Sequence, residues 1–535
     1  MSSISSLSRV ASGLIVSQRG LEVTGHNIAN ANSIGYVRQQ VLQNDSFYQT
    51  IGRNGNDLLS LGAGSDITEI RQIRDEFLDK AYRNQICSKE FYEVQYNAAM
   101  EIETIMGEVD GESFSSVLRD FWNQLQNLSI APQDQGTRTQ FIQSASVLVD
   151  KINYINDKLI EYQNNLNNQV VETVDRINEI AEEIRDLNEQ IVKYEISGDN
   201  ANDLRDRRNV LLDELSQYID ISYKEDQAGR VNVSAEGYPL VSEQSVYKIT
   251  LTQADPNSKS PFLKPVWEHT GDDVIRFNKP IGSEFGNDTG KLKALLLTRG
   301  DRYGNYLDTE TASAYEDIEP YFIPRVQAEF DTLVHDLVTT INDILAPQIQ
   351  SSDSPQGLDG TQHVELFKRK YMDRYDGSGT YQVEDPNDPN TLYSAGNIEI
   401  NPILLDEDGY NKLCLSSDGS VGDTKIIQEI LDAWQEPNTT YDQTSAHKLN
   451  FEDYYSEFIT RIAEVGNKAS QKVEEKEIVV NSIDNSRSSI SGVSTDEEMT
   501  NLMKYQHAYN ASARMVSIID SMLDTVINRT GIAGR

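Results

Sequence analysis

Both ends of the chain carry apolar residues at the alternating three- and four-residue spacing of a coiled-coil seam. At the N-terminal end the seam comprises Ile4, Leu7, Ala11, Leu14, Leu21 and Ile28. At the C-terminal end the matching stripe comprises Leu502, Tyr509, Ala513, Val516, Leu523 and Ile527. This spacing is typical of helices that pack along one another. We therefore predict that residues 1–60 and 490–535 form one domain, in which the terminal helices pair as a coiled coil.

The two seams are weak for helices that stand alone. Ala11, Gln18 and Gly25 occupy positions that a self-sufficient coiled coil fills with Leu or Ile. A glycine inside a helix also costs about 1 kcal/mol relative to alanine. We therefore expect residues 1–50 and 495–535 to be disordered in the isolated chain and to become helical when copies assemble.

Local signals mark where these terminal helices end and begin. The first helix is expected to end near Asn30, because the Asn-rich stretch and Gly35 favour turns and the left-handed conformation. The alternation after Gly35 then predicts a strand or extended arm from Tyr36 to Leu42. The last helix opens on a capping box, formed either by Ser494 with Glu497 or by Thr495 with Glu498.

The interior contains further helical repeats. Heptad runs from Ile152 to Leu166 and from Ile177 to Tyr194 are offset by a stutter, which locally unwinds a coiled coil. A break at residues 198–200 is followed by "ANDLRDRRNVLLDELSQYIDI", which predicts a return helix. Two more helical repeats begin at Phe322 and Phe451. We predict a long-helix bundle domain from residues 61–220 with 286–350 and 446–489.

Two stretches depart from the helical pattern. Residues 221–285 alternate polar and apolar side chains between turn residues, which is typical of strands. Residues 351–445 combine "DPNDPN" and "DGSGT" with short strand-like runs. We predict that both form β-rich regions on the outside of the molecule. The expected fold class is mainly α with β-rich insertions.

The charge balance limits the partners that the chain can bind. Its 47 basic and 85 acidic residues give a net charge of −38, which disfavours nucleic acid and anionic membranes. No run reaches the ~18 apolar residues that a membrane span needs, and the N-terminal segment lacks the pattern of a cleavable secretory signal. The two cysteines, Cys87 and Cys414, fit neither a disulfide framework nor a zinc site. Two buried thiols without a disulfide are the favoured interpretation, with a single disulfide left open.

No catalytic or metal-binding pattern emerges from the sequence. None of the six histidines has the spacing of a paired metal ligand. "GNDTGKL" has the wrong glycine spacing for a phosphate-binding loop, and no nucleophile elbow occurs. The many carboxylates are interpreted as a solvated acidic surface. We expect no enzymatic activity and no cofactor.

The two ends resemble the bacterial flagellar axial proteins, the group of rod, hook and hook-associated proteins. In "SGLIVSQRGLEVTGHNIANANSIGYVRQQ" the signature of that group is matched by Asn27, Ile28, Ala29, Asn30, Ala31, Asn32, Gly35 and Tyr36. His26 stands where the group has its first Asn, and Ser33 replaces a Thr. The C-terminal "GVSTDEEMTNLMKYQHAYNASARMVSIIDSMLDTVIN" is similar to the C-terminal helix of the same group. Two interior segments, "ANDLRDRRNVLLDELS" and "GKLKALLLTRGD", resemble motifs of the hook-associated protein 1 family.

This resemblance implies a structural adaptor that joins the flagellar hook to the filament and assembles through its terminal helices. The implied partners are further copies of the chain, the hook protein, hook-associated protein 3, the export apparatus and an export chaperone. The implied location is the flagellum outside the cell, reached without a cleaved signal peptide. The alternatives are another axial protein, such as the hook protein or hook-associated protein 3, or a cytoplasmic coiled-coil scaffold.

Overall fold

The longest apolar repeat of the sequence forms one continuous helix. Helix α4, Gln135–Glu195, has 61 residues, and in this computed structural model it runs without a break through the predicted stutter. Leu166, Val170, Val174 and Ile177 are all buried, so the apolar row continues across the offset between the two heptad runs. The structure describes residues 2–529 apart from 55–56, 108–112, 197, 255–259, 278–280, 352–353, 438 and 441–447.

The chain divides into two units, each built from segments that are distant in sequence. The first unit contains residues 1–88, 176–248 and 475–535, and the second contains residues 89–175 and 249–474. Three helices contribute to both units, namely α2 (Glu76–Met106), α4 and α11 (Phe451–Ser491). The predicted domain boundaries had placed these helices wholly in one helical domain.

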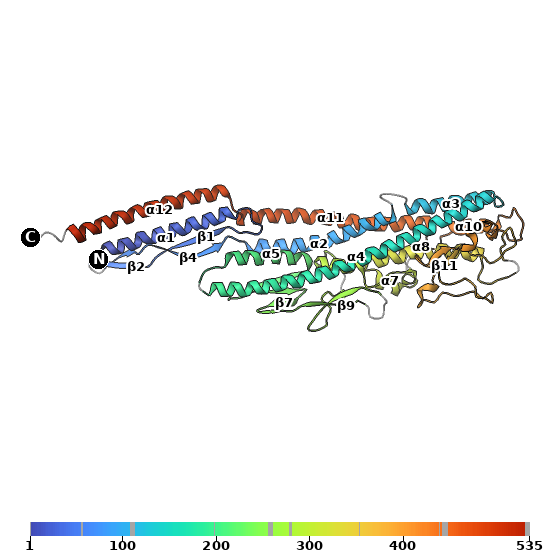
Figure 1. The fold of residues 1–535 in the computed structure, drawn as a ribbon, viewed down its shortest axis with the longest axis horizontal. Helices are drawn as coiled ribbons and strands as arrows, with labels where there is room; N and C mark the ends of the chain where they lie inside the picture. The colour runs from blue at the N-terminus through green and yellow to red at the C-terminus, as the bar shows by residue number, and fades with distance from the viewer. Residues whose placement is uncertain are drawn as a thin grey trace, which may run out of the picture. The chain divides into compact units, whose positions relative to one another are not determined.

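The first unit contains both terminal helices, α1 (Ser2–Ala29) and α12 (Thr495–Asp524), which lie side by side (Figure 1). A π-helical turn, Thr525–Arg529, follows α12. After α1, strand β1 (Gln39–Asp45) pairs antiparallel with β4 (Ser65–Gln72). Strands β2 (Tyr48–Asn54) and β3 (Asp57–Gly62) form the antiparallel hairpin between them. The sequence predicted the start of β1 but not the hairpin, because β2 and β3 lack a clear polar–apolar alternation.

The same unit contains the predicted return helix and the sheet that follows it. Helix α5, Asn202–Tyr218, begins after the break at residues 198–200. Strands β5 (Ile221–Glu225), β6 (Val231–Ala235), β7 (Tyr238–Ser242) and β8 (Ser245–Val246) form a four-stranded antiparallel meander. Strand β6 buries Val231, Val233 and Ala235 on one face, as its alternating sequence predicts.

The second unit is a helical layer with small β elements. Its helices besides parts of α2, α4 and α11 are α3 (Phe114–Ile130), α6 (Lys291–Arg299), α7 (Ala312–Ile318), α8 (Phe322–Leu345), α9 (Pro402–Leu405) and α10 (Lys425–Gln435). Strand β9 (Ile249–Gln253) pairs with β10 (Leu263–Trp267), and β11 (Phe367–Arg369) pairs with β12 (Ile398–Ile400). Helix α8 buries Phe330, Leu333, Leu337 and Ile341 on the face that its heptad spacing predicted.

The mainly α class with β-rich insertions is confirmed, with one difference. Residues 351–445 were expected to be β-rich, yet the strands in their described part are two of three residues each, beside the short helix α9, two 3₁₀ turns and the helix α10. Most of this stretch is irregular backbone fixed by side-chain hydrogen bonds. Asn342 of α8, for example, accepts from the amides of Leu366 and Phe367 through its Oδ1. Turn-rich composition predicts irregular structure here better than it predicts strands.

Candidate assembly site

Helices α1 and α12 pair antiparallel in a heptad register. A Cβ atom added to Gly13 would lie 3.5 Å from Ser512 Oγ, and one added to Gly20 would lie 2.5 Å from the ring of Tyr505. One heptad further, Asn27 Nδ2 donates to Glu498 Oε2 at 3.0 Å. Each seven-residue step forward along α1 is therefore matched by a seven-residue step back along α12. The predicted pairing of the termini occurs within a single chain.

The residues in this register are small or polar, which explains why the seam looked poor in the sequence. Two glycines of α1 leave room for the Tyr505 ring and for close approach of the helix backbones. Val16, Ser17, Val23 and Thr24 are the buried neighbours of this row on α1. On α12 the buried positions include Glu498 and Ile519. Close backbone approach, rather than large interlocking side chains, brings the two helices together.

The predicted seam residues lie beside this closest row. On α1 the half-buried members are Leu7, Ala11, Leu14, Leu21 and Ile28. On α12 the half-buried members are Leu502, Tyr509, Ala513, Val516 and Leu523. Ile527, in the π-helical turn, is 69% exposed. The side chain of Ile4 lies outside the described residues. We expected the terminal segments to become ordered only on assembly. In the structure, residues 2–29 and 495–524 are already helical and paired within one chain.

Asn27 is the hub that connects the end of α1 to α12 and to the first strand. Its side chain is 1% exposed. Its Oδ1 accepts from Tyr36 Oη at 2.8 Å and from the Gln39 amide at 3.0 Å. Its Nδ2 donates to the Gln39 carbonyl at 2.9 Å, besides the bond to Glu498. All four hydrogen-bonding positions of the amide are therefore used, and only an amide side chain combines two N–H donors with an acceptor oxygen in this way.

The turn after α1 gives the signature residues their separate roles. Asn30 Nδ2 donates to the His26 carbonyl at 3.1 Å and so closes the last turn of the helix. Gly35 has a φ of 77°, and a Cβ there would meet Val210 of α5 at 2.1 Å. Ala29 and Asn32 are exposed and Ala31 is half-buried. Four residues of the signature form the hydrogen bonds and the turn described here, namely Asn27, Asn30, Gly35 and Tyr36.

Side chains of helix α5 accept hydrogen bonds from the segment that follows this turn. Asp206 Oδ2 accepts from the Val37 amide at 3.1 Å, and its Oδ1 accepts from Gln72 of β4 at 2.7 Å. Asp203 accepts from the Gln39 side chain at 3.0 Å. Burial raises the pKa of Asp206 to about 7, despite these donors. The aspartates of the interior motif in α5 therefore hold the arm that follows the N-terminal motif.

Arg38 secures the other side of the arm to the start of α12. Its Nε donates to Glu498 Oε1 at 2.9 Å, and a terminal nitrogen donates to Glu497 at 2.9 Å. Its backbone amide donates to the Ser491 carbonyl at 2.8 Å, just before α12 begins. Ser494 is the N-cap of α12 and accepts from the Glu497 amide, so the first of the two predicted caps is the one formed. Glu498 serves the Asn27 contact instead.

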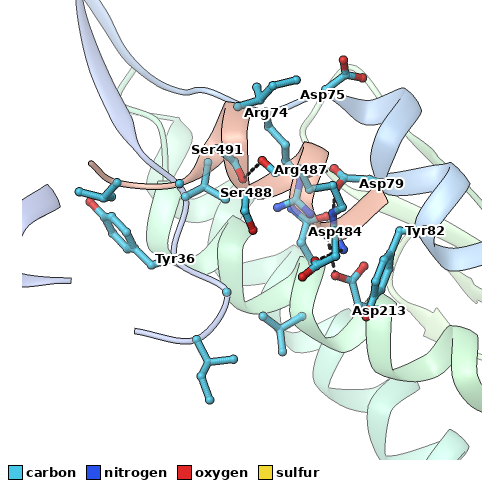
Figure 2. A pocket seen from close by; sticks show the side chains of 18 of the residues that line it. Tyr36, Arg74, Asp75, Asp79, Tyr82, Asp213, Asp484, Arg487, Ser488 and Ser491 are labelled. Atoms are coloured by element: carbon cyan, nitrogen blue, oxygen red, sulfur yellow. Dashed lines mark hydrogen bonds and ion pairs between the residues drawn. The ribbon is translucent and has the colours of Figure 1, made fainter. Parts of the chain in front are cut away.

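A chain of partly buried ion pairs lies next to this junction, around a cavity of about 490 Å³ (Figure 2). Arg487 of α11 donates to Asp79 of α2 at 2.9 Å and to Asp213 of α5 at 2.7 Å. Asp79 also pairs with Arg74, and Asp213 also pairs with Arg83. Two carboxylates thus alternate with three guanidinium groups and connect three helices. Each carboxylate has two guanidinium partners, so loss of Arg487 would leave each aspartate with one counter-ion and would remove the link from α11 to α2 and α5.

Much of this site escaped sequence reasoning. The N-terminal motif was found by resemblance, and Arg38 was noted only as part of it. Asp79, Asp213 and Arg487 carried no local signal, and Glu498 was singled out only as a candidate capping residue, since the partners found here are hundreds of residues away in the chain. The interior Asn-Asp-Leu motif was the one sequence feature that could have indicated Asp206. Among the described residues, no group of three or more His, Cys, Asp or Glu side chains is arranged to hold a metal ion.

Exposed apolar side chains gather on the last helix. Along α12 and the turn after it, seven large apolar residues are exposed, namely Met499, Met503, Met515, Ile518, Met522, Val526 and Ile527. Ile34, in the turn after α1, is 95% exposed. Scattered apolar residues are ordinary on a protein surface, but a succession along one helix marks a contact surface. In the described part of the chain, no helix is apolar and long enough to cross a membrane.

Comparisons with known proteins first show that the chain is similar to the bacterial flagellar axial proteins. Residues 485–529, which include α12, match the C-terminal domain of the flagellar basal body rod proteins FlgEFG. Residues 99–359 match the helical domain of the flagellar hook-associated protein FlgK.

Relatives matched over nearly their full length indicate which member of that class the chain resembles. The chain is 27% identical to flagellar hook-associated protein 1 of Bacillus subtilis (strain 168), over 98% of this chain and 97% of the relative. It is 24% identical to flagellar hook-associated protein 1 of Escherichia coli (strain K12), over 98% and 99% respectively. The flagellar hook junction protein FlgK from Burkholderia pseudomallei shares the fold, with a TM-score of 0.54 at 12% identity, covering 77% of this chain and 100% of that one. The chain is a relative of flagellar hook-associated protein 1, which confirms the resemblance seen in the sequence.

Proposed function

We propose that this chain is a structural adaptor of the bacterial flagellum that joins the hook to the filament. The observation that carries the proposal is the α1–α12 pair, closed by Asn27 and Glu498, which leaves a succession of exposed apolar side chains along α12. A helix pair that is fixed in one chain and still apolar on its surface suits packing against further copies. The near full-length similarity to hook-associated protein 1 gives the location of that packing.

The match to the FlgK helical domain separates this function from its alternatives. The C-terminal match at residues 485–529 is to rod proteins and so agrees with several axial proteins. The match at residues 99–359 is to hook-associated protein FlgK and favours the junction over the hook protein or hook-associated protein 3. A cytoplasmic scaffold has no corresponding support.

The finer features of the proposal follow from this function. The partners are other copies of the chain, the hook protein, hook-associated protein 3 and, during export, the export apparatus with a chaperone. The chain acts outside the cell at the hook–filament junction and is exported without a cleaved signal peptide. It has no catalytic role and binds neither nucleic acid nor membrane. The predicted seam residues belong to the assembly surface, and residues 1–60 with 490–535 act as the axial part.

A deletion strain tests the role in the flagellum. Without the chain, cells should carry intact hooks that lack filaments, and plasmid-borne wild-type chain should restore them, as seen by electron microscopy. Filaments on the deletion strain would contradict the junction role. Loss of the hooks themselves would instead indicate the hook protein.

A surface variant tests the role of α12. Ile518→Asp with Met522→Asp should leave the thermal melt within about 1 °C, because both side chains are exposed in the single chain, and should abolish filament formation, because a charge buried in an assembly is costly. Val383→Asp, at a position that is 72% exposed in the second unit, is the control and should still support filaments. Normal filaments with the α12 variant would contradict the assigned surface.

A further inference from the structure

A cavity with several cationic lining residues lies in the first unit of this acidic protein. The cavity has a volume of about 620 Å³ and is lined by residues of β4, α2, α5, β5 and the loops next to them. Its cationic lining comprises Arg71, Arg74, Arg83, Arg205, Arg208 and Lys224. Its carboxylates are fewer, namely Glu76, Asp79 and Glu225. Arg74, Arg83 and Arg205 also pair with carboxylates outside the lining. The positive charge of the lining that has no ion pair therefore rests on Arg71 and Lys224, in a chain that carries −38.

The carboxylates present do not occupy all the donors. Glu225 bridges Arg205 at 2.8 Å and Arg208 at 3.0 Å. Arg208 is 2% exposed, and its Nε has no hydrogen-bond partner among the described residues. A buried donor without an acceptor destabilises the folded chain. An acceptor supplied from outside the chain would relieve that cost.

Two cations at the cavity are also without a charged partner. Arg71 donates only to Gln40, at 3.3 Å, and Lys224 is exposed with no ion pair in the described part of the chain. Burial lowers the pKa of Arg208 to about 10, so the group gains from a nearby negative charge. Guanidinium groups recognise carboxylates through paired N–H···O bonds.

We propose that this cavity binds carboxylate side chains of a second copy of the chain. The proposal rests on the proposed function, since it needs copies that lie next to one another. Copies of so acidic a chain repel each other, and this repulsion falls where carboxylates of one copy enter a cationic cavity of the next. With 85 acidic residues, each copy presents such carboxylates in abundance. The contact lies on β4, α2, α5 and β5 and would fix the rotation of neighbouring subunits.

A titration of the full-length chain tests the chemistry of the cavity without assembly. The probe is a hexaglutamate peptide, followed by isothermal calorimetry at constant ionic strength. The wild-type chain should bind it, and Arg71→Gln with Lys224→Gln should weaken binding at least tenfold. Arg185→Gln with Lys193→Gln removes the same charge from α4 in the same unit, outside the cavity, and should leave binding within twofold. Absence of binding, equal weakening by both pairs, or binding of inorganic phosphate but not of the peptide would overturn the inference.

Zero-length cross-linking tests the second copy as the source. Assemblies from mixed ¹⁴N- and ¹⁵N-labelled chains are treated with a carbodiimide, which joins an amine to a carboxylate in contact, and are analysed by mass spectrometry. Lys224 should appear in cross-links that combine both isotopes. Lys224 cross-links of one isotope only, within intact assemblies, would overturn the inference and leave the proposed function standing. Failure to form assemblies would count against the proposed function, while the titration still decides the cavity.

Discussion

Asn27 shows how one side chain can fix the geometry of a chain terminus. Its amide joins α1, the arm after it and the first turn of α12 through four hydrogen bonds. Tyr36 completes the group, since its hydroxyl donates to Asn27 and lies 3.0 Å from His26 Nδ1. Burial, with nearby carboxylates, raises the pKa of that hydroxyl, so it stays protonated as a donor. The Asn-rich signature therefore supplies a hydrogen-bonded group, the polar lock, that holds α1, the arm after it and the first turn of α12 together.

Asn27→Asp should lower the stability of the first unit by about 3 kcal/mol, because it places a carboxylate against Glu498 and the Gln39 carbonyl. All three tryptophans, Trp122, Trp267 and Trp434, lie in the second unit. Far-UV circular dichroism should therefore show an earlier melting phase while the tryptophan fluorescence transition stays unchanged. Asn32→Asp, at an exposed signature position, is the matched control. An unchanged dichroism melt for Asn27→Asp would contradict the lock.

Asp206 should make the first unit less stable as the pH rises. Its pKa is raised by burial to about 7 in the folded chain, so between about pH 4 and 7 the folded state holds a proton that the unfolded state has released. This contribution is fully present near pH 4 and is lost as the pH rises to 7, at up to about 1.4 kcal/mol per pH unit. Urea melts by circular dichroism at pH 5, 6 and 7 should show a steeper decline for the wild type than for Asp206→Asn. Equal slopes would show that the carboxyl does not titrate in this range.

At the scale of elements, the helix seams were predictable and the polar junction was not. Helices α4, α5, α8, α11 and α12 follow from apolar spacing, because a buried helix face repeats every three to four residues. The residues that lock α1 to α12 do not repeat. Asn27 and Glu498 are 471 positions apart, and Asp79 and Arg487 are 408 positions apart. Contacts of this kind are set by tertiary structure, so a single sequence identifies them only by resemblance.

Two glycines of α1 should respond in opposite ways to the same substitution. Gly20→Ala should destabilise the chain, because the new Cβ would lie 2.5 Å from the Tyr505 ring. Gly25→Ala should stabilise it by about 1 kcal/mol, because no atom lies within 4 Å of its Cβ and alanine is the better helix former. Thermal melts by circular dichroism compare the two. Tyr505→Ala should restore the Gly20→Ala variant, and two stabilising glycine substitutions would contradict the helix register.

At the scale of the whole molecule, the chain is organised around non-local segments. The first unit contains both termini, and the second contains residues 351–437, which the sequence predicted to be part of an outer β-rich insertion. Within the second unit, Phe367 and Trp434 pack their rings on Phe121 of α3. Arg138 of α4 donates to the carbonyls of Tyr410 and Leu413. This stretch is therefore part of the unit's core.

Deleting residues 351–445 should unfold the second unit. The deletion removes Phe367 and Trp434, and loss of one large core side chain already costs about 3–5 kcal/mol. Limited proteolysis should cleave the truncated chain rapidly within residues 89–175. The surface variant Val383→Asp, inside the same stretch, should remain resistant. A protease-resistant truncated chain that still supports filaments would show that the stretch is dispensable.

The central claim, that the chain joins hook to filament, is tested most directly by locating it on intact flagella. Antibodies against the chain, detected with colloidal gold, are applied to flagella sheared from wild-type cells and viewed by electron microscopy. We predict gold confined to a narrow band where the hook meets the filament. Gold along the whole filament or along the hook, or none on flagella that contain the chain by immunoblot, would contradict the account.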